Sequence, residues 1–114
     1  MTSPPDRKAI GSAFASAVNM SADELNAWLA TDESRAVGWK GADGERSESV
    51  GHASGRRIVE ILRSRESELT DADYAHMRKV VGFVHRHLAQ EPANKATSRW
   101  RYSLMNWGHD PLKD

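Results

Sequence analysis

The stretch of the sequence best suited to binding chemistry is residues 49–57, which read Ser-Val-Gly-His-Ala-Ser-Gly-Arg-Arg. A helix that begins here would present free N–H groups and a positive dipole end to an anion, and glycine allows a phosphate to approach the backbone. An arginine could add a forked contact. One prediction is therefore an anion-binding site formed by Gly51, His52, Ser54, Gly55 and Arg56. The alternative is an ordinary helix N-cap at Ser54, because the Gly-Lys-Ser/Thr ending of a phosphate-binding Walker loop is missing.

A second group of candidate residues is cationic. Residues 56–101 hold ten Lys/Arg and six Asp/Glu, a balance of +4 within a chain of net charge +0. On predicted helices, Arg56 shares a face with Arg63, and Lys79 shares a face with Arg86 around Gly82. Such cationic faces suit the phosphates of a nucleic acid. The residues predicted to contact nucleic acid are Arg56, Arg57, Arg63, Lys79 and Arg86. The alternative is a solvated surface, which the intervening Glu60 favours.

The histidines give no sign of a metal site. His85 and His87 are two positions apart on a predicted helix and point in nearly opposite directions, while His76 and His87 are separated by roughly 16 Å along it. Without cysteine, no zinc-like spacing supports a site. No nucleophile, base and orienting group can be named, since neighbours such as His109 and Asp110 rarely face each other. We therefore expect a non-enzymatic protein with no catalytic residue, metal or cofactor.

A third set of residues favours a protein partner. Trp39 lies in a glycine-rich segment, and Arg99 and Tyr102 share the polar side of the last predicted helix. Exposed tryptophan, tyrosine and arginine are enriched at protein interfaces. A protein–protein or homodimer interface at Trp39, Arg99 and Tyr102 is therefore the alternative to nucleic-acid binding.

The elements that must position these residues are helices. Apolar residues recur at helical spacing, and strand-like alternation is absent. The pattern predicts an all-α bundle of four to five helices: one before residue 19, a second after a Ser21–Glu24 capping box, a third over 54–67, a fourth over 71–90 and a fifth over 98–107. Residues 32–49 are predicted to be a break whose Val37 and Trp39 cover the core. Thr70 is predicted to cap the fourth helix, and Gly108 to end the fifth in a left-handed conformation. The predicted division is an N-terminal helix or extension over 1–19, which could be mobile, and a helical domain over 20–114.

Composition bounds the class of protein. The 114 residues suit one domain, and 39% hydrophobic residues with four Trp exclude a disordered chain. No apolar run approaches the roughly 20 residues that span a bilayer, so no membrane partner is expected. The zero cysteines and the absence of a signal-peptide pattern at the N-terminus predict a cytoplasmic protein.

Three strings are distinctive in combination: SVGHASGRRIVEIL, DYAHMRKVVGFVHRHLAQ and SLMNWGHDP. They resemble an uncharacterised family of small bacterial and fungal proteins, a domain of unknown function, over about residues 20–113. Some members of that family carry a DNA-binding label, but the resemblance supplies no catalytic residue. It implies shared motifs that contain twelve residues of this chain: His52, Ser54, Gly55, Arg56, His76, Arg78, His85, Arg86, His87, Asn106, Trp107 and His109. These residues could form either a buried polar network or a binding surface.

Overall fold

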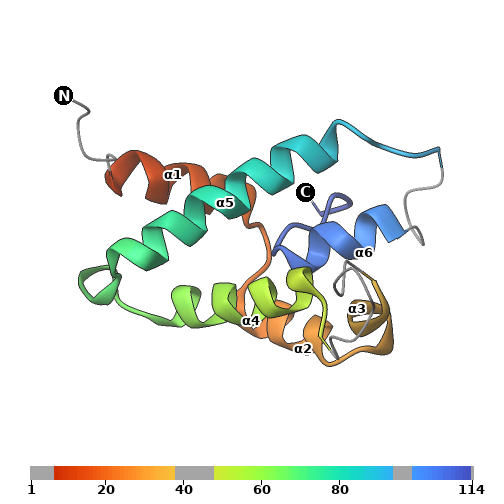
Figure 1. Ribbon diagram of the computed structural model, residues 1–114, viewed down its shortest axis with the longest axis horizontal. Coiled ribbons are helices and arrows are strands. Elements are labelled where there is room, and N and C mark those ends of the chain that lie inside the picture. The colour runs from red at the N-terminus through yellow and green to blue at the C-terminus, as the bar shows by residue number, and fades with distance from the viewer. Residues whose placement is uncertain (1–6, 38–47, 94–98, 114) are drawn as a thin grey trace.

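A computed structural model describes residues 7–37, 48–93 and 99–113, and these residues are all-helical, as predicted (Figure 1). They form six α-helices and one 3-10 helix: α1 (Arg7–Ala17), α2 (Ala22–Leu29), α3 (Asp32–Ala36), α4 (Val50–Arg63), η1 (Glu66–Glu68), α5 (Asp71–Leu88) and α6 (Arg99–Asn106). None of these helices is long and apolar enough to cross a membrane.

The helix missed by the sequence prediction is α3, which lies inside the predicted break over 32–49. It follows α2 after two residues, and the hydroxyl of Thr31 accepts a hydrogen bond from Ser34 N at 3.2 Å. A five-residue helix contains too few turns to show an apolar period, so the sequence pattern did not distinguish it from a break. Val37 is buried as predicted. Trp39 lies outside the described residues.

The predicted boundaries of α4 are wrong at both ends. The helix begins at Val50, because the hydroxyl of Ser49 accepts a hydrogen bond from His52 N at 3.0 Å and so caps it five residues before Ser54. It ends at Arg63, and η1 occupies part of the chain that was assigned to its last turn. On its inner side Val59 is buried, whereas Leu62 is 37% exposed.

The other helix ends follow the predicted capping chemistry. Capping boxes join Ser21 to Glu24 at the start of α2 and Thr70 to Asp73 at the start of α5. Gly108 has a φ of 82° directly after α6, as its position predicted. A Cβ there would also lie 2.9 Å from Val18, so glycine fits this turn for two reasons.

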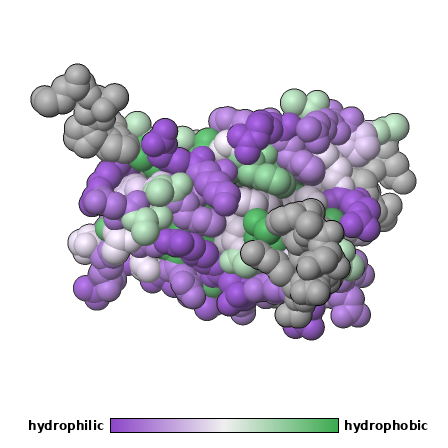
Figure 2. All heavy atoms as spheres, viewed as in Figure 1, coloured by the Kyte–Doolittle hydropathy of each residue, from purple (hydrophilic) through white to green (hydrophobic). Residues whose placement is uncertain are grey.

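The helices pack as two pairs joined by α6. The first helix, α1, lies against α5, and α2 lies against α4, while α6 contacts α2, α3, α4 and α5 (Figure 1). The least exposed apolar side chains come from four different helices: Leu25, Ile58, Val80, Val84 and Leu104. The visible face of the molecule is mostly hydrophilic, with small hydrophobic areas between the charged residues (Figure 2).

The segment after α6 is tied to the turn between α1 and α2. His109 Nδ1 is 2.7 Å from the carbonyl oxygen of Ala17, and Asn19 Nδ2 donates to the carbonyl oxygen of Asp110 at 2.9 Å. These hydrogen bonds place the start of α2 beside the end of α6. They also fix Trp107 at the point where α4, α5 and α6 meet.

Candidate functional site

The glycines of residues 49–57 lie inside α4 rather than in a loop before a helix. A Cβ on Gly55 would lie 2.5 Å from the carbonyl oxygen of Asn106, and one on Gly51 would lie 3.0 Å from Trp107 Nε1. Both glycines therefore allow α4 to cross α6 closely. Their lack of a side chain is explained by helix packing and not by the approach of a phosphate.

The polar residues of the same segment are engaged in hydrogen bonds within the protein. His52 Nε2 is 2.7 Å from the carbonyl oxygen of Leu29, and its Nδ1 faces the carboxylate of Glu48. Ser54, the predicted N-cap, instead lies on the buried side of α4, with its hydroxyl 2.9 Å from His76 Nε2. Burial, together with the charges of Arg57 and Lys79, lowers the pKa of His76. These contacts join α4 to α2 and α5.

Each of the three α4 arginines predicted to contact nucleic acid is paired with a carboxylate. Arg56 Nε donates to Glu48 at 2.6 Å, and the Arg56 hydrogen bonds, with a further one from His52, lower the pKa of Glu48 to about 2. Arg57 pairs with Asp73 at 3.3 Å, and Arg63 pairs with Asp23 at 3.1 Å. Carboxylates of neighbouring segments thus largely balance the positive charge of α4. These partners lie 8, 16 and 40 residues away in sequence.

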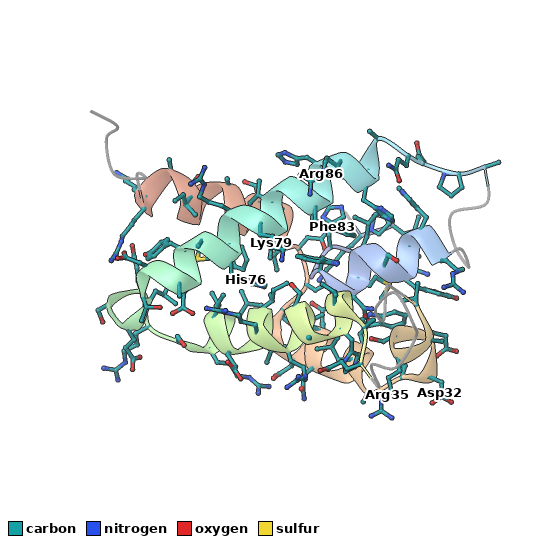
Figure 3. The ribbon with its side chains drawn as sticks, in the orientation of Figure 1. Asp32, Arg35, His76, Lys79, Phe83 and Arg86 are labelled. Carbon is teal, nitrogen blue, oxygen red and sulfur yellow. The ribbon has the colours of Figure 1, made fainter. Side chains whose placement is uncertain are left out.

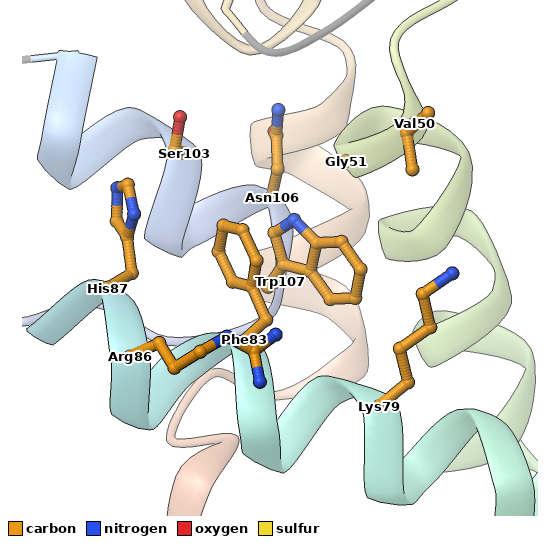
Figure 4. A pocket seen from close by; sticks show the side chains of 9 residues that line it. All are labelled: Val50, Gly51, Lys79, Phe83, Arg86, His87, Ser103, Asn106 and Trp107. Carbon is orange, nitrogen blue, oxygen red and sulfur yellow. The ribbon is translucent and has the colours of Figure 1, made fainter.

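Lys79 and Arg86 differ from the α4 arginines. Both are exposed residues of α5, and neither has a carboxylate partner within the described part of the chain. They lie on the rim of a pocket of about 550 Å³ between α4, α5 and α6. This pocket is lined by Val50, Gly51, Lys79, Phe83, Arg86, His87, Ser103, Asn106 and Trp107 (Figure 4).

One wall of the pocket is a row of stacked aromatic rings. The Phe83 ring lies between those of Trp107 and His87, with centroid distances of 4.3 and 5.0 Å and interplanar angles of 15° and 18° (Figure 4). His76 extends the row beyond Trp107, and Trp100 extends it beyond His87, at 6.2 and 6.4 Å. Figure 3 shows His76, Lys79 and Phe83 on the side of α5 that faces α4 and α6. The pocket therefore combines rigid apolar walls with two cations.

His87 brings an unsatisfied polar atom to this wall. Its Nε2 is buried and has no hydrogen-bond partner among the described residues. Burial lowers the pKa of His87, so the imidazole is neutral at pH 7. The peptide carbonyl of the same residue accepts a hydrogen bond from Trp100 Nε1 at 2.6 Å, which fixes the backbone.

Gly82 gives Arg86 room to fold back along α5. A Cβ at Gly82 would lie 3.0 Å from Arg86 Nη1, which places the guanidinium over the glycine. Figure 4 shows the Arg86 side chain extending toward Phe83. The sequence grouping of Lys79, Gly82 and Arg86 is thus a real face of α5. It borders the pocket between α4, α5 and α6.

The predicted partner surface is not assembled in the described structure. Tyr102 packs on Trp28 with ring centroids 5.3 Å apart, and Arg99 is exposed at the start of α6. Trp28 Nε1 in turn donates to Asn106 Oδ1 at 2.8 Å. Tyr102 thus has a structural contact of its own. Trp39 cannot be placed beside either residue, because it lies outside the described ranges.

The sequence reasoning did not single out Phe83 or Ser103, and it named His87 and Trp107 as possible binding residues only among the residues of the shared motifs. A signal was present for two of them, since Phe83 and His87 lie four and eight positions after Lys79 and so follow it on one face of a helix. Ser103 and Trp107 belong to α6, and no local pattern relates them to α5.

The sequence left open whether the shared-motif residues form a buried polar network or a binding surface. In the structure some of them join helices, and others line the pocket. His52, Ser54, His76, Asn106 and His109 form hydrogen bonds that join helices. Arg86, His87 and Trp107 line the pocket. Within the described ranges, no three His, Asp or Glu residues are grouped so as to hold a metal ion.

Comparison with known proteins agrees with the resemblance carried by the three sequence strings. No curated protein and no solved structure matches the chain. One family profile, described as a protein of unknown function, DUF3140, matches residues 13–105 and so covers α4, α5 and all of α6 except its last residue. The chain belongs to this family of proteins of unknown function, DUF3140.

Proposed function

We propose that the protein is a non-catalytic binding domain that holds a small organic anion in the pocket between α4, α5 and α6. The observation that carries this proposal is the placement of two unpaired cations, Lys79 and Arg86, on the rim of an apolar pocket. The proposal moves the predicted anion site from Gly51–Arg57 to the neighbouring face of α5.

The size of the pocket suits such a ligand. Its volume of about 550 Å³ lies inside the range of roughly 300–1,000 Å³ that is typical of small-molecule sites. Burial of an apolar body contributes roughly 25 cal/mol per Å² removed from water. The two cations favour a negatively charged end group, and the apolar wall excludes inorganic phosphate as the whole ligand. The ligand is therefore expected to have both an apolar body and an acid group.

The test is calorimetric titration of the full chain with medium-chain carboxylates such as octanoate, compared with 1-octanol. We expect octanoate to bind more tightly. The double variant Lys79→Gln/Arg86→Gln should weaken octanoate binding about tenfold or more, since hydrogen bonds to charged groups contribute roughly 1.5–3 kcal/mol each. Arg35→Gln is the matched control, because Arg35 is an exposed cation on α3, far from the pocket (Figure 3). Equal binding of octanoate and octanol, or equal loss in the control, would refute the proposal.

A second proposal is binding of nucleic acid through its phosphates. The same two cations on one face of α5 favour it, because they are available for a polyanion. With Arg56, Arg57 and Arg63 held by carboxylates, Lys79 and Arg86 remain as the main contacts. Two phosphate contacts predict a log–log salt slope of only about −2.

Fluorescence anisotropy of labelled duplex and single-stranded DNA at two salt concentrations tests this second proposal. Weak binding with a slope of about −2, abolished by Lys79→Gln/Arg86→Gln, would support it. A log–log salt slope near −5 that changes when the α4 arginines are replaced would instead indicate that all five predicted cations contact phosphates. No binding at low salt would dismiss nucleic acid.

A further inference from the structure

We propose that the ligand carries two acid groups joined by an apolar chain, and that its second acid group occupies a smaller pocket beside the first. One acid group would lie at Arg86, and the other at Lys79, where the two pockets meet. The inference rests on the proposed function, since it adds a subsite to the same pocket and names the class of ligand, a linear dicarboxylate.

The first argument is the smaller pocket itself, which has a volume of about 230 Å³ and lies between α4 and α5. It shares three lining residues with the larger pocket: Val50, Lys79 and Trp107. Its volume is below the roughly 300–1,000 Å³ of typical small-molecule sites, so it suits the end group of a ligand better than a whole ligand. A ligand in the larger pocket can extend into the smaller one past Val50 and Trp107.

The second argument is the divergence of the two unpaired cations. Arg86 folds back over Gly82 and, of these two pockets, lines only the larger, whereas Lys79 lines both. Figure 4 shows Lys79 extending from α5 toward Val50, and Arg86 extending toward Phe83. A single carboxylate at Arg86 leaves Lys79 without a partner. Two carboxylates joined by an apolar chain meet both cations and keep the chain against the apolar wall.

The third argument is the charge around the smaller pocket. Arg57 and His76 line it beside Lys79, and none of its lining residues is acidic. Burial, together with the charges of Arg57 and Lys79, lowers the pKa of His76. Asp73 acts in the opposite direction, but its carboxylate is paired with Arg57 at 3.3 Å. The imidazole therefore stands in a positive field that a bound carboxylate would offset.

His76 links this field to the ligand. Its Nε2 is 2.9 Å from the hydroxyl of Ser54, so the ring is held at the wall of the smaller pocket. A nearby carboxylate favours the charged form of an imidazole and raises its pKa. The second acid group of the ligand would thus gain a further cation, and binding would be accompanied by proton uptake at His76.

The probe for this inference is sebacate, a linear ten-carbon dicarboxylate. Its extended chain is comparable in length to the seven residues from Lys79 to Arg86, about 10 Å along α5. Monomethyl sebacate keeps the chain and removes one charge, and succinate keeps both charges on a chain too short to join the two cations. In calorimetric titration of the full chain, sebacate should bind about tenfold or more tightly than either, because a hydrogen bond to a second charged group is added.

Single variants test whether each cation holds one acid group. In Lys79→Gln and in Arg86→Gln the second carboxylate lacks its partner, so the preference for sebacate over monomethyl sebacate should fall to about twofold or less. Arg35→Gln, the exposed control on α3, should keep the full preference. A preference that survives in both Lys79→Gln and Arg86→Gln would overturn the inference.

The imidazole C–H signals in a proton NMR spectrum locate the second acid group. Sebacate should raise the pKa of His76, assigned through His76→Gln, more than monomethyl sebacate does. His85 is exposed on α5 and lines neither pocket, so its signal should not respond to sebacate. Sebacate binding without a change at His76 would overturn the placement of the second acid group in the smaller pocket.

The same titrations separate this inference from the proposed function. Equal binding of sebacate and monomethyl sebacate, with octanoate binding still weakened by Lys79→Gln/Arg86→Gln, would overturn the second acid group and leave the proposed function standing. No binding of any of these acids, or binding that the double variant does not weaken, would overturn both.

Discussion

The cations of α4 and the cations of α5 differ in their surroundings. Arg56, Arg57 and Arg63 are each held by a carboxylate, whereas Lys79 and Arg86 border a pocket without acidic residues. The positive balance of residues 56–101 therefore overstates the charge that an anionic ligand can meet. Paired charges mainly join helices, and unpaired charges remain available for binding.

The glycines of the two helices show the same contrast. Gly55 of α4 is packed against the backbone of α6, and Gly82 of α5 faces only the flexible end of Arg86. On α4, glycine serves the fold, while on α5 it serves the position of a cation. Replacing each of these glycines by alanine tests the two positions in the same way.

Gly55→Ala should have the largest effect on stability. Its Cβ would lie 2.5 Å from the carbonyl oxygen of Asn106 and 2.7 Å from Leu29, and backbone cannot move as cheaply as a side-chain end. We expect the free energy of unfolding to fall by about 3 kcal/mol, as for overpacked cores. Urea unfolding followed by circular dichroism measures it. A loss no larger than that of a surface substitution would mean that α4 and α6 do not cross as closely as described.

Acidification should distinguish the half-buried His76 and His87 from the exposed His85. His76 and His87 have pKa values lowered mainly by burial, so the unfolded chain binds protons before the folded chain as the pH falls below about 6.5. Their contribution to stability is complete above that pH and is lost as the pH falls toward their folded pKa values. The lowered pKa of Glu48 adds a loss only below about 4.5.

Urea unfolding at pH 7.5 and 5.5 measures this histidine effect. His76→Gln should reduce the difference in unfolding free energy between the two pH values. His85→Gln, at an exposed position of the same helix, should leave the difference unchanged. An equal reduction in both variants would show that burial at His76 is not the cause.

Features that depend on residues close together in the chain were predicted from the sequence, whereas features that depend on contacts between distant residues were not. The caps at Ser21 and Thr70 and the turn at Gly108 were predicted correctly, because each depends on residues within one helical turn. The start of α4 was wrong because Ser49 and Ser54 are both good caps, and the choice depends on packing against α6.

The candidate site was predicted in part. Lys79 and Arg86 were found from their spacing on one helix. Their distinction from Arg63 was not found, because Asp23, its partner, lies 40 residues away and no local pattern reports it. The aromatic wall was missed for the same reason, since Phe83 and Trp107 come from different helices.

Gly82→Ala should raise stability and weaken binding at once. Alanine is favoured over glycine in a helix interior by about 1 kcal/mol, and the nearest neighbour of its Cβ, the Arg86 guanidinium, can move. We expect the free energy of unfolding to rise by about 0.5–1 kcal/mol. Octanoate affinity should fall a fewfold, because Arg86 is displaced.

Gly11→Ala is the control for this prediction. Gly11 lies in α1, where an added Cβ would meet nothing within 4 Å, so the gain in stability should be similar. Its binding affinity should not change. Equal affinities for Gly82→Ala and the original chain would show that the folded-back position of Arg86 is not used for binding.

Arg63→Gln should have the smallest effect and gives the sharpest test of the comparison between the two helices. Arg63 and Asp23 are 53% and 94% exposed, and pairs this exposed contribute roughly 0–1 kcal/mol. We expect a change in unfolding free energy below about 0.5 kcal/mol and no change in anion affinity, by urea unfolding and calorimetry. A loss of affinity as large as that of Arg86→Gln would mean that Asp23 releases Arg63 to an anionic ligand. The positive charge of α4 would then count toward binding after all, and the ligand would have to be large enough to reach both helices.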